Sequence, residues 1–204
     1  LENLLPFLRS TDLPLWQVLD WYNLLETSAT LPILEKASRS IGWKYASERL
    51  QHSPYIPLPG DWEAYLESID KKQRHEIRRK LRRLEQSETP NRWYFADGRD
   101  LEREIQAFLD LMANDPEKEA FLTPLMREQM TKTIRCAFEE GCLHLAFLEI
   151  DGQKAAGYLS FDYLDRIWVY NSGLDRKFME YSPGWVLLAY LLRWANENHR
   201  SEFD

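Results

Sequence analysis

The sequence has few cysteines and no long apolar run. Its two cysteines, Cys136 and Cys142, are too few for a disulfide framework and lack metal-ligand spacing with the four histidines. We therefore expect no metal, and we interpret both as idle or buried thiols in a reducing cytoplasm. No run of roughly eighteen apolar residues predicts a transmembrane segment, and no signal-peptide pattern opens the chain. These absences exclude disulfide-rich secreted domains and helical membrane proteins, and we expect a cytoplasmic location.

The motifs of hydrolytic triads are also missing. Neither a Ser-His-Asp pattern nor a Gly-x-Ser-x-Gly elbow occurs in the sequence. His144 lies among Leu143, Leu145 and Phe147, so we interpret it as a hydrogen-bonded sheet histidine rather than a catalyst. The sequence therefore does not indicate hydrolysis by a serine nucleophile.

What is present is a globular composition. With 44% hydrophobic and 13% aromatic residues, the 204 residues suffice for one sizeable domain or for one and a half. Leu1 is not a start methionine, and 201–204 has the character of a strand that has just begun. We therefore expect a piece of a longer protein, truncated at its C-terminus.

Periodicity and turn residues predict a succession of helices and strands. Residues 1–60 indicate helices over 13–25 and 32–40, a strand over 43–50 and an extended, proline-rich segment over 54–59. Asp61 caps a helical stretch that continues to Gln86, with a break near Asp70. The elements expected next are a strand over 92–97, helices over 100–114 and 124–140, strands over 142–150, 153–163 and 166–173, a helix from 182 and a strand from 201. Asp151-Gly152 is a tight hairpin signal, so the three central strands form an antiparallel meander.

The helix from 182 opens with Tyr181-Ser182-Pro183-Gly184-Trp185. Ser182 suits the N-cap and Pro183 the first helical position, which leaves the next N–H groups free. Free amides at a helix N-terminus are typical of a phosphate site, and Gly184 lets the anion come close. The alternative is an ordinary cap, because Ser-Pro starts many helices that bind nothing. Residues 185–192 are apolar on every face, which predicts a buried helix and favours the ligand site.

A second feature is a strongly basic helix. Eight cations occupy the thirteen residues from Lys71 to Arg83, although the chain carries a formal charge of −7. One interpretation is a solvated helix face paired with acidic residues elsewhere. The other is a surface for phosphates, those of RNA, a nucleotide-linked substrate or anionic lipid. In the second case Lys71, Arg74 and Arg78 are the candidate substrate-binding residues.

Several short motifs carry a family resemblance. They are Lys71–Glu85, Ala156-Gly157-Tyr158, Tyr170–Asp175 and Tyr181–Gly184. Together with the order of elements, they resemble the acyl-CoA N-acyltransferase superfamily called GNAT. The resemblance is closest to GNAT domains linked to bacterial cellulose and polysaccharide synthesis, a branch related to the Fem-type peptidyltransferases, which use aminoacyl-tRNA. It implies a GNAT-like α/β (α+β) fold, with a mixed, mostly antiparallel sheet flanked by helices.

The resemblance also implies domain limits and a reaction. Residues 1–60 are then the tail of a preceding GNAT-like lobe or an inter-lobe segment, 61–90 a basic connecting helix, and 91–204 an incomplete acyltransferase domain. The implied reaction is transfer of an acyl group from acetyl-CoA or another acyl-CoA to an amine or hydroxyl. The alternatives are an aminoacyl-tRNA or another anionic carrier as donor, and a non-catalytic binding module. The implied donor-binding residues are Asn171, Ser172, Tyr181, Ser182, Gly184 and Trp185.

Acyl transfer needs a base for the proton of the nucleophile. The candidates at the ends of the central strands are Asp162, Tyr163 and Tyr170. Strand alternation places Asp162 on one face with Ser160 and Tyr158, and Tyr170 on one face with Trp168 and Ser172. The alternative for each candidate is a polar edge or core residue with a local partner.

Overall fold

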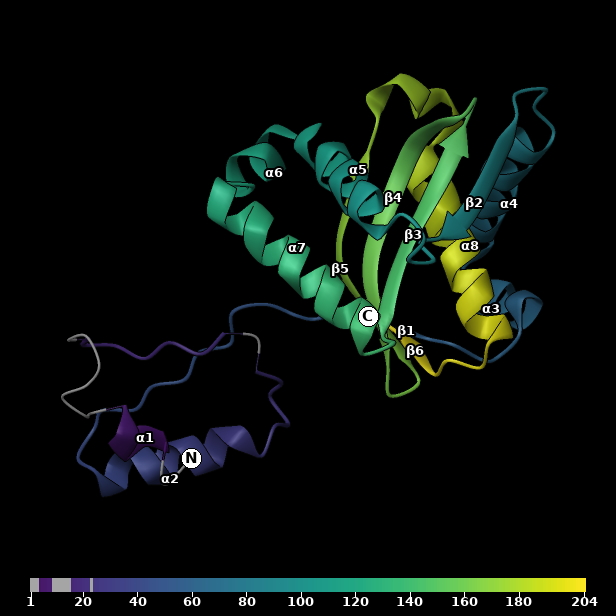
Figure 1. Ribbon diagram of the computed structural model, residues 1–204. Helices are drawn as coiled ribbons and strands as arrows, with labels where there is room; N and C mark the ends of the chain where they lie inside the picture. Colours follow the sequence, from purple (N-terminus) through teal and green to yellow (C-terminus); the bar gives the residue numbers. More distant parts are fainter. Residues whose placement is uncertain (1–3, 9–15, 23) are drawn as a thin grey trace. The chain divides into compact units, whose positions relative to one another are not determined.

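The computed structural model describes residues 4–8, 16–22 and 24–204 (Figure 1). The chain forms two compact units, Leu1–His52 and Ser53–Asp204. In the described ranges, no helix has the length and apolar character needed to cross a membrane. The candidate site residues predicted from the sequence all lie in the second unit.

The first unit is small. It contains α1 (Leu4–Phe7) and α2 (Thr30–Ser40), which share a core of Leu5, Leu34 and Ala37. The helix predicted over 32–40 is thereby confirmed. The strand predicted over 43–50 is wrong, because that segment has no partner strand among the described residues of its unit and adopts irregular backbone. The helix predicted over 13–25 begins outside the described residues, and its described part is not helical.

The second unit is built on a six-stranded sheet with the order β1-β6-β5-β4-β3-β2. Its strands are β1 (Ile56–Pro57), β2 (Asn91–Phe95), β3 (Leu143–Ile150), β4 (Gln153–Tyr163), β5 (Arg166–Leu174) and β6 (Glu202–Phe203). All neighbouring pairs are antiparallel except β5 and β6, which are parallel. The hairpin between β3 and β4 turns at Asp151 and Gly152, both with positive φ, as predicted. The fold is thus mixed α/β, with a mostly antiparallel sheet.

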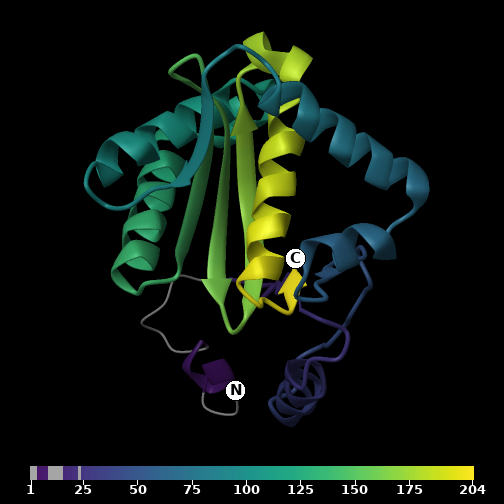
Figure 2. The ribbon, with the colours of Figure 1, turned by 90° about the vertical axis from the view of Figure 1, so that its right-hand side faces the viewer.

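Helices cover both faces of the sheet (Figures 1 and 2). One face carries α5 (Leu101–Ala113), α6 (Pro116–Phe121) and α7 (Pro124–Glu139). The apolar stripes of α5 and α7 enclose a core around Phe108, Met112 and Phe147, whereas α6 buries no residue. The other carries α3 (Trp62–Ser68), α4 (Lys71–Glu85) and α8 (Pro183–Glu197), with a core that includes Leu66, Leu84 and Leu187. A 3-10 helix, η1 (Arg176–Tyr181), joins β5 to α8.

The predicted break in the basic helical stretch separates α3 from α4. Asp70 adopts an extended conformation, and its carboxylate accepts hydrogen bonds from the backbone N–H groups of Lys72 and Gln73, at 2.9 and 3.0 Å. This is a side-chain N-cap, which satisfies two of the amides that a helix start leaves unpaired. The basic helix α4 therefore starts as an element of its own.

A β-bulge interrupts β5. Leu159 lies opposite Asn171 and Ser160 opposite Val169, so Tyr170 is the extra residue without a partner in this ladder. An extra residue reverses the alternation of the residues after it. Ser172 therefore lies opposite Tyr158, which packs in the core on the α8 side, and not on the face of Trp168. The predicted common face of Trp168, Tyr170 and Ser172 is wrong for this reason, whereas Asp162 and Ser160 alternate as expected.

Candidate functional site

The start of α8 lies directly after β5 and η1 (Figure 2). Ser182 has a left-handed conformation, with φ of 53°, and among the described residues no amide donates to its hydroxyl. Its role in the cap differs from the predicted one: its carbonyl accepts from the N–H of Val186 at 3.0 Å. Pro183 has no N–H, so the amides of Gly184 and Trp185 are the two that the helix leaves free.

Space around these two amides is open. A Cβ built on Gly184 meets only the Leu174 side chain, at 3.6 Å, which is an ordinary contact. The Trp185 side chain is 60% exposed. Side chains therefore do not plug the Gly184 position, and Trp185 is exposed beside it.

The C-terminal half of α4 lies beside this turn. The Lys80 ammonium stands 5.0 Å from the centroid of the Trp185 ring, in cation–π geometry. The Arg83 guanidinium donates to the carbonyl of Glu180 at 2.8 Å, and the Tyr181 hydroxyl lies 3.1 Å from that of Thr89. The fold therefore brings two cations to the start of α8, from a segment about a hundred residues earlier in the chain. Both belong to the predicted basic helix, but the sequence did not indicate that these two of its cations lie beside the turn.

The predicted substrate-binding cations lie toward the other end of α4. Arg74 donates to the carbonyl of Leu66 at 3.0 Å, and Arg78 pairs with Glu63 at 2.5 Å. Lys71, the first residue of α4, lies about 14 Å along the helix axis from Lys80, at 1.5 Å per residue. Arg74 and Arg78 thus tie α4 to α3, and the structure does not bring these three residues to the turn.

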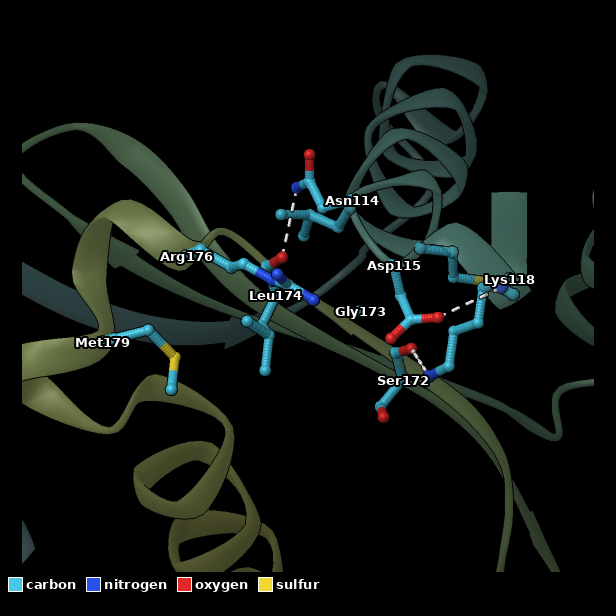
Figure 3. A pocket seen from close by; sticks show the side chains of 10 residues that line it. Asn114, Asp115, Lys118, Ser172, Gly173, Leu174, Arg176 and Met179 are labelled. Carbon is cyan, nitrogen blue, oxygen red and sulfur yellow. Dashed lines mark hydrogen bonds between the residues drawn. The ribbon is translucent and has the colours of Figure 1, made fainter. Parts of the chain in front are cut away.

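A cavity of about 440 Å³ opens at the end of β5, on the side of α5 (Figure 3). Its lining comprises Leu111, Met112, Asn114, Asp115, Lys118, Ser172, Gly173, Leu174, Arg176 and Met179. Two side chains hold the strand end: the Asn114 amide donates to the Leu174 carbonyl at 3.1 Å, and the Lys118 ammonium donates to the Ser172 carbonyl. Leu174 contacts both the cavity and the Gly184 position, so the cavity adjoins the turn.

The three candidate bases lie at different distances from this cavity. Asp162 accepts two hydrogen bonds from Arg200, both 2.7 Å, and Tyr163 is 59% exposed at the β4–β5 turn. Both lie opposite the first residues of β5, roughly 23 Å along the strand from Leu174. Tyr170 occupies the bulge, 51% exposed, about 13 Å from Leu174 by the same spacing. Of the three, only Tyr170 is near the cavity.

Comparisons with known proteins identify the family to which this chain belongs. A family model described as "Acetyltransferase (GNAT) domain" matches residues 71–204, which include α4, the cavity and the α8 turn. The chain belongs to this GNAT acetyltransferase family. The solved structure titled "Crystal structure of FemX" is similar, with a TM-score of 0.59 and 11% sequence identity, which shows a shared fold. The similarity covers 84% of this chain and 58% of that one. A search of curated proteins finds no match.

Two further polar clusters of the GNAT domain lie outside this site. His144 is 4% exposed and faces α8, between the rings of Phe95 and Trp194. Burial lowers its pKa to about 4, and in the described part of the chain neither ring nitrogen, nor the hydroxyl of Ser160 opposite, has a hydrogen-bond partner. His144 is thus a buried sheet histidine, as predicted, but without the expected hydrogen bond.

The second cluster lines a cavity of about 510 Å³ beside the edge strand β2 of the GNAT domain. The Tyr94 hydroxyl lies 3.2 Å from both Glu104 and Glu149, which pair with Lys154 and Arg92. Burial, followed by the two carboxylates, raises the pKa of Tyr94. These charges balance one another, which indicates a structural network. Among the described residues, no three His, Cys, Asp or Glu side chains group as metal ligands.

Proposed function

We propose that this GNAT domain transfers an acyl group from acyl-CoA to an amine or hydroxyl acceptor. The observation that carries the proposal is the start of α8, where the amides of Gly184 and Trp185 have no partner within the helix, the Gly184 position is uncrowded and Trp185 is exposed. The family match supports it, because the matched region includes this turn. The motif resemblance adds a proposed setting in cell-envelope polysaccharide metabolism.

The donor in this proposal lies along β5. Its pyrophosphate accepts hydrogen bonds from the Gly184 and Trp185 amides, where the helix dipole favours negative charge. Lys80 and Arg83 flank the same position and add positive charge. Asn171, Ser172, Tyr181 and Ser182 are proposed to line the path. The acyl end then reaches toward the bulge and the cavity of about 440 Å³.

The proposed chemistry is nucleophilic substitution at the thioester carbonyl. The acceptor nitrogen or oxygen bonds to the carbonyl carbon, the carbon–sulfur bond breaks, and the thiolate leaves with the electron pair. The nucleophile loses one proton and the thiolate gains one. Tyr170 is the proposed proton-transfer group, because it occupies the bulge nearest the cavity. Asp162 is less suited to that role, because both its carboxylate oxygens pair with Arg200.

Calorimetry with acetyl-CoA tests the donor site. Gly184→Trp places a large side chain over the free amides, and we expect it to weaken acetyl-CoA binding at least about tenfold. The matched control is Leu125→Trp, because Leu125 follows an N-cap and a proline at the start of α7 as Gly184 does in α8, and is 76% exposed. No binding by the wild type, or equal binding by wild type and Gly184→Trp, contradicts the proposal.

A second candidate is transfer from an aminoacyl-tRNA, the donor of the Fem-type enzymes that the motifs resemble. The fold likeness to FemX and the eight cations of α4 favour it. Binding of tRNA driven by phosphates weakens steeply with salt. A salt titration of tRNA affinity with a flat response excludes this candidate, and a steep response that Lys80→Gln and Arg83→Gln reduce supports it. A non-catalytic module that binds tRNA through α4 passes the same test but transfers no aminoacyl group.

A further inference from the structure

Two cations of the cavity at the end of β5 lack a counter-ion. Lys118 extends from α6 and Arg176 from η1, and they approach the strand end from opposite sides (Figure 3). Within residues 53–204 neither forms an ion pair, whereas the adjacent Lys177 pairs with Asp175 at 3.8 Å. The Lys118 ammonium donates to the Ser172 carbonyl, which satisfies one of its three donors. The cavity lining therefore offers unused cationic donors.

One residue of the cavity lining, Asp115, carries a carboxylate, and this carboxylate caps α6. Its Oδ1 accepts from the amides of Glu117 and Lys118 at 3.0 and 3.2 Å. With one carboxylate against two cations, the lining carries a net formal charge of about +1. A ligand with a single negative charge neutralises this lining.

Apart from Asn114 and Ser172, the rest of the cavity lining is apolar. Leu111 and Met112 of α5 form a buried wall, and Leu174 and Met179 complete it from β5 and η1. The volume, about 440 Å³, lies in the range of small-molecule sites. The cavity thus suits a short apolar group that ends in an anion.

We propose that this cavity binds a carboxylate-bearing group, with Arg176 as its main partner and Lys118 as the second. The proposal rests on the proposed acyl transfer, since the carboxylate belongs either to the acceptor or to the acyl chain of the donor. A planar guanidinium matches a carboxylate with two parallel hydrogen bonds, and such charge-assisted bonds are the stronger ones. The site therefore selects substrates by a charge remote from the reacting carbonyl.

Two matched pairs of probes distinguish the two sources by calorimetry on the full chain. Succinyl-CoA against butyryl-CoA tests a carboxylate on the acyl chain. L-leucine against 3-methylbutylamine, which lacks only the carboxylate, tests a carboxylate on the acceptor. The variant is Arg176→Gln, and the control is Lys177→Gln, which removes an adjacent cation that lies outside the cavity lining.

We expect the carboxylate-bearing member of one pair to bind about tenfold more tightly, a preference that Arg176→Gln removes and Lys177→Gln retains. The pair that shows the preference identifies the source. The inference is overturned if the two members of each pair bind with equal affinity. It is also overturned if Arg176→Gln and Lys177→Gln lose the preference for the carboxylate equally. If butyryl-CoA binds but neither carboxylate-bearing probe is preferred, the carboxylate site is ruled out while the proposed acyl transfer stands. If neither CoA ester binds but L-leucine binds more tightly than 3-methylbutylamine, the proposed acyl-CoA donor is wrong and the carboxylate site stands.

Discussion

Replacing His144 with leucine is expected to make the stability of the GNAT domain less dependent on pH. His144 is 4% exposed, with the rings of Phe95 and Trp194 at 4.3 and 4.6 Å, and its nitrogens have no partner in the described chain. Burial lowers its pKa from 6.5 to about 4, the neighbouring Asp162 opposes this shift, and Arg200 adds to it. His144 is therefore neutral in the native state over a range where the unfolded chain binds a proton.

The magnitude follows from proton linkage. Because the unfolded state binds the extra proton, the contribution of His144 is complete above its unfolded pKa of 6.5 and is lost as the pH falls through about 4. A pKa unit corresponds to about 1.4 kcal/mol, so the native state loses about 2 kcal/mol between pH 7 and 5, and about 3 kcal/mol by pH 4. Leucine at this position does not titrate and fits the apolar surroundings.

Urea unfolding at pH 7, 6 and 5 measures this contribution. The free energy of unfolding of wild type should fall by about 2 kcal/mol more than that of His144→Leu over this range. His75→Leu serves as the control, because His75 is exposed on α4, and its pH dependence should match that of wild type. Identical pH dependence in wild type and His144→Leu refutes the reasoning.

The remaining predictions concern β5. Gly173→Ala should lower the free energy of unfolding by about 1–3 kcal/mol in urea, because its Cβ falls 2.5 Å from backbone atoms of Leu111 and Met112. Gly184→Ala, whose Cβ has an ordinary contact at 3.6 Å, should cost less, and equal costs contradict the argument from space. Tyr170→Phe should slow release of CoA from acetyl-CoA and acceptor about a hundredfold, with the affinity for acetyl-CoA unchanged; an unaltered rate rejects Tyr170 as the proton-transfer group.

Much of the second unit is predictable from local signals. The alternation over 153–163 and the Asp151-Gly152 turn predict β4 and its hairpin, and β4 spans Gln153–Tyr163 as predicted. The proline at the start of α7 and the predicted cap Asp61 before α3 mark helix starts that the structure confirms. These signals act within a few residues, because hydrophobic periodicity and capping depend on the immediate neighbours in the chain.

The site was only partly predictable. The turn at Gly184 follows from its sequence, but the bulge at Tyr170 has no sequence signal in this strand, and it reverses the face of Ser172. The ion pair of Asp162 with Arg200 joins residues 38 positions apart. Both depend on which strands and helices become neighbours, which periodicity alone does not specify.

The sequence by itself therefore determined most of the order of elements in the second unit, the free amides at the start of α8 and the basic character of α4. Only the tertiary structure decided which cations face the turn and which groups meet in the cavity. Lys80 reaches Trp185 because α4 packs on α8, and Lys118 lines the same cavity as Arg176 because α6 lies at the end of β5. Capping and periodicity act between close neighbours in the chain, whereas a binding site needs side chains from distant segments held together by a packed core.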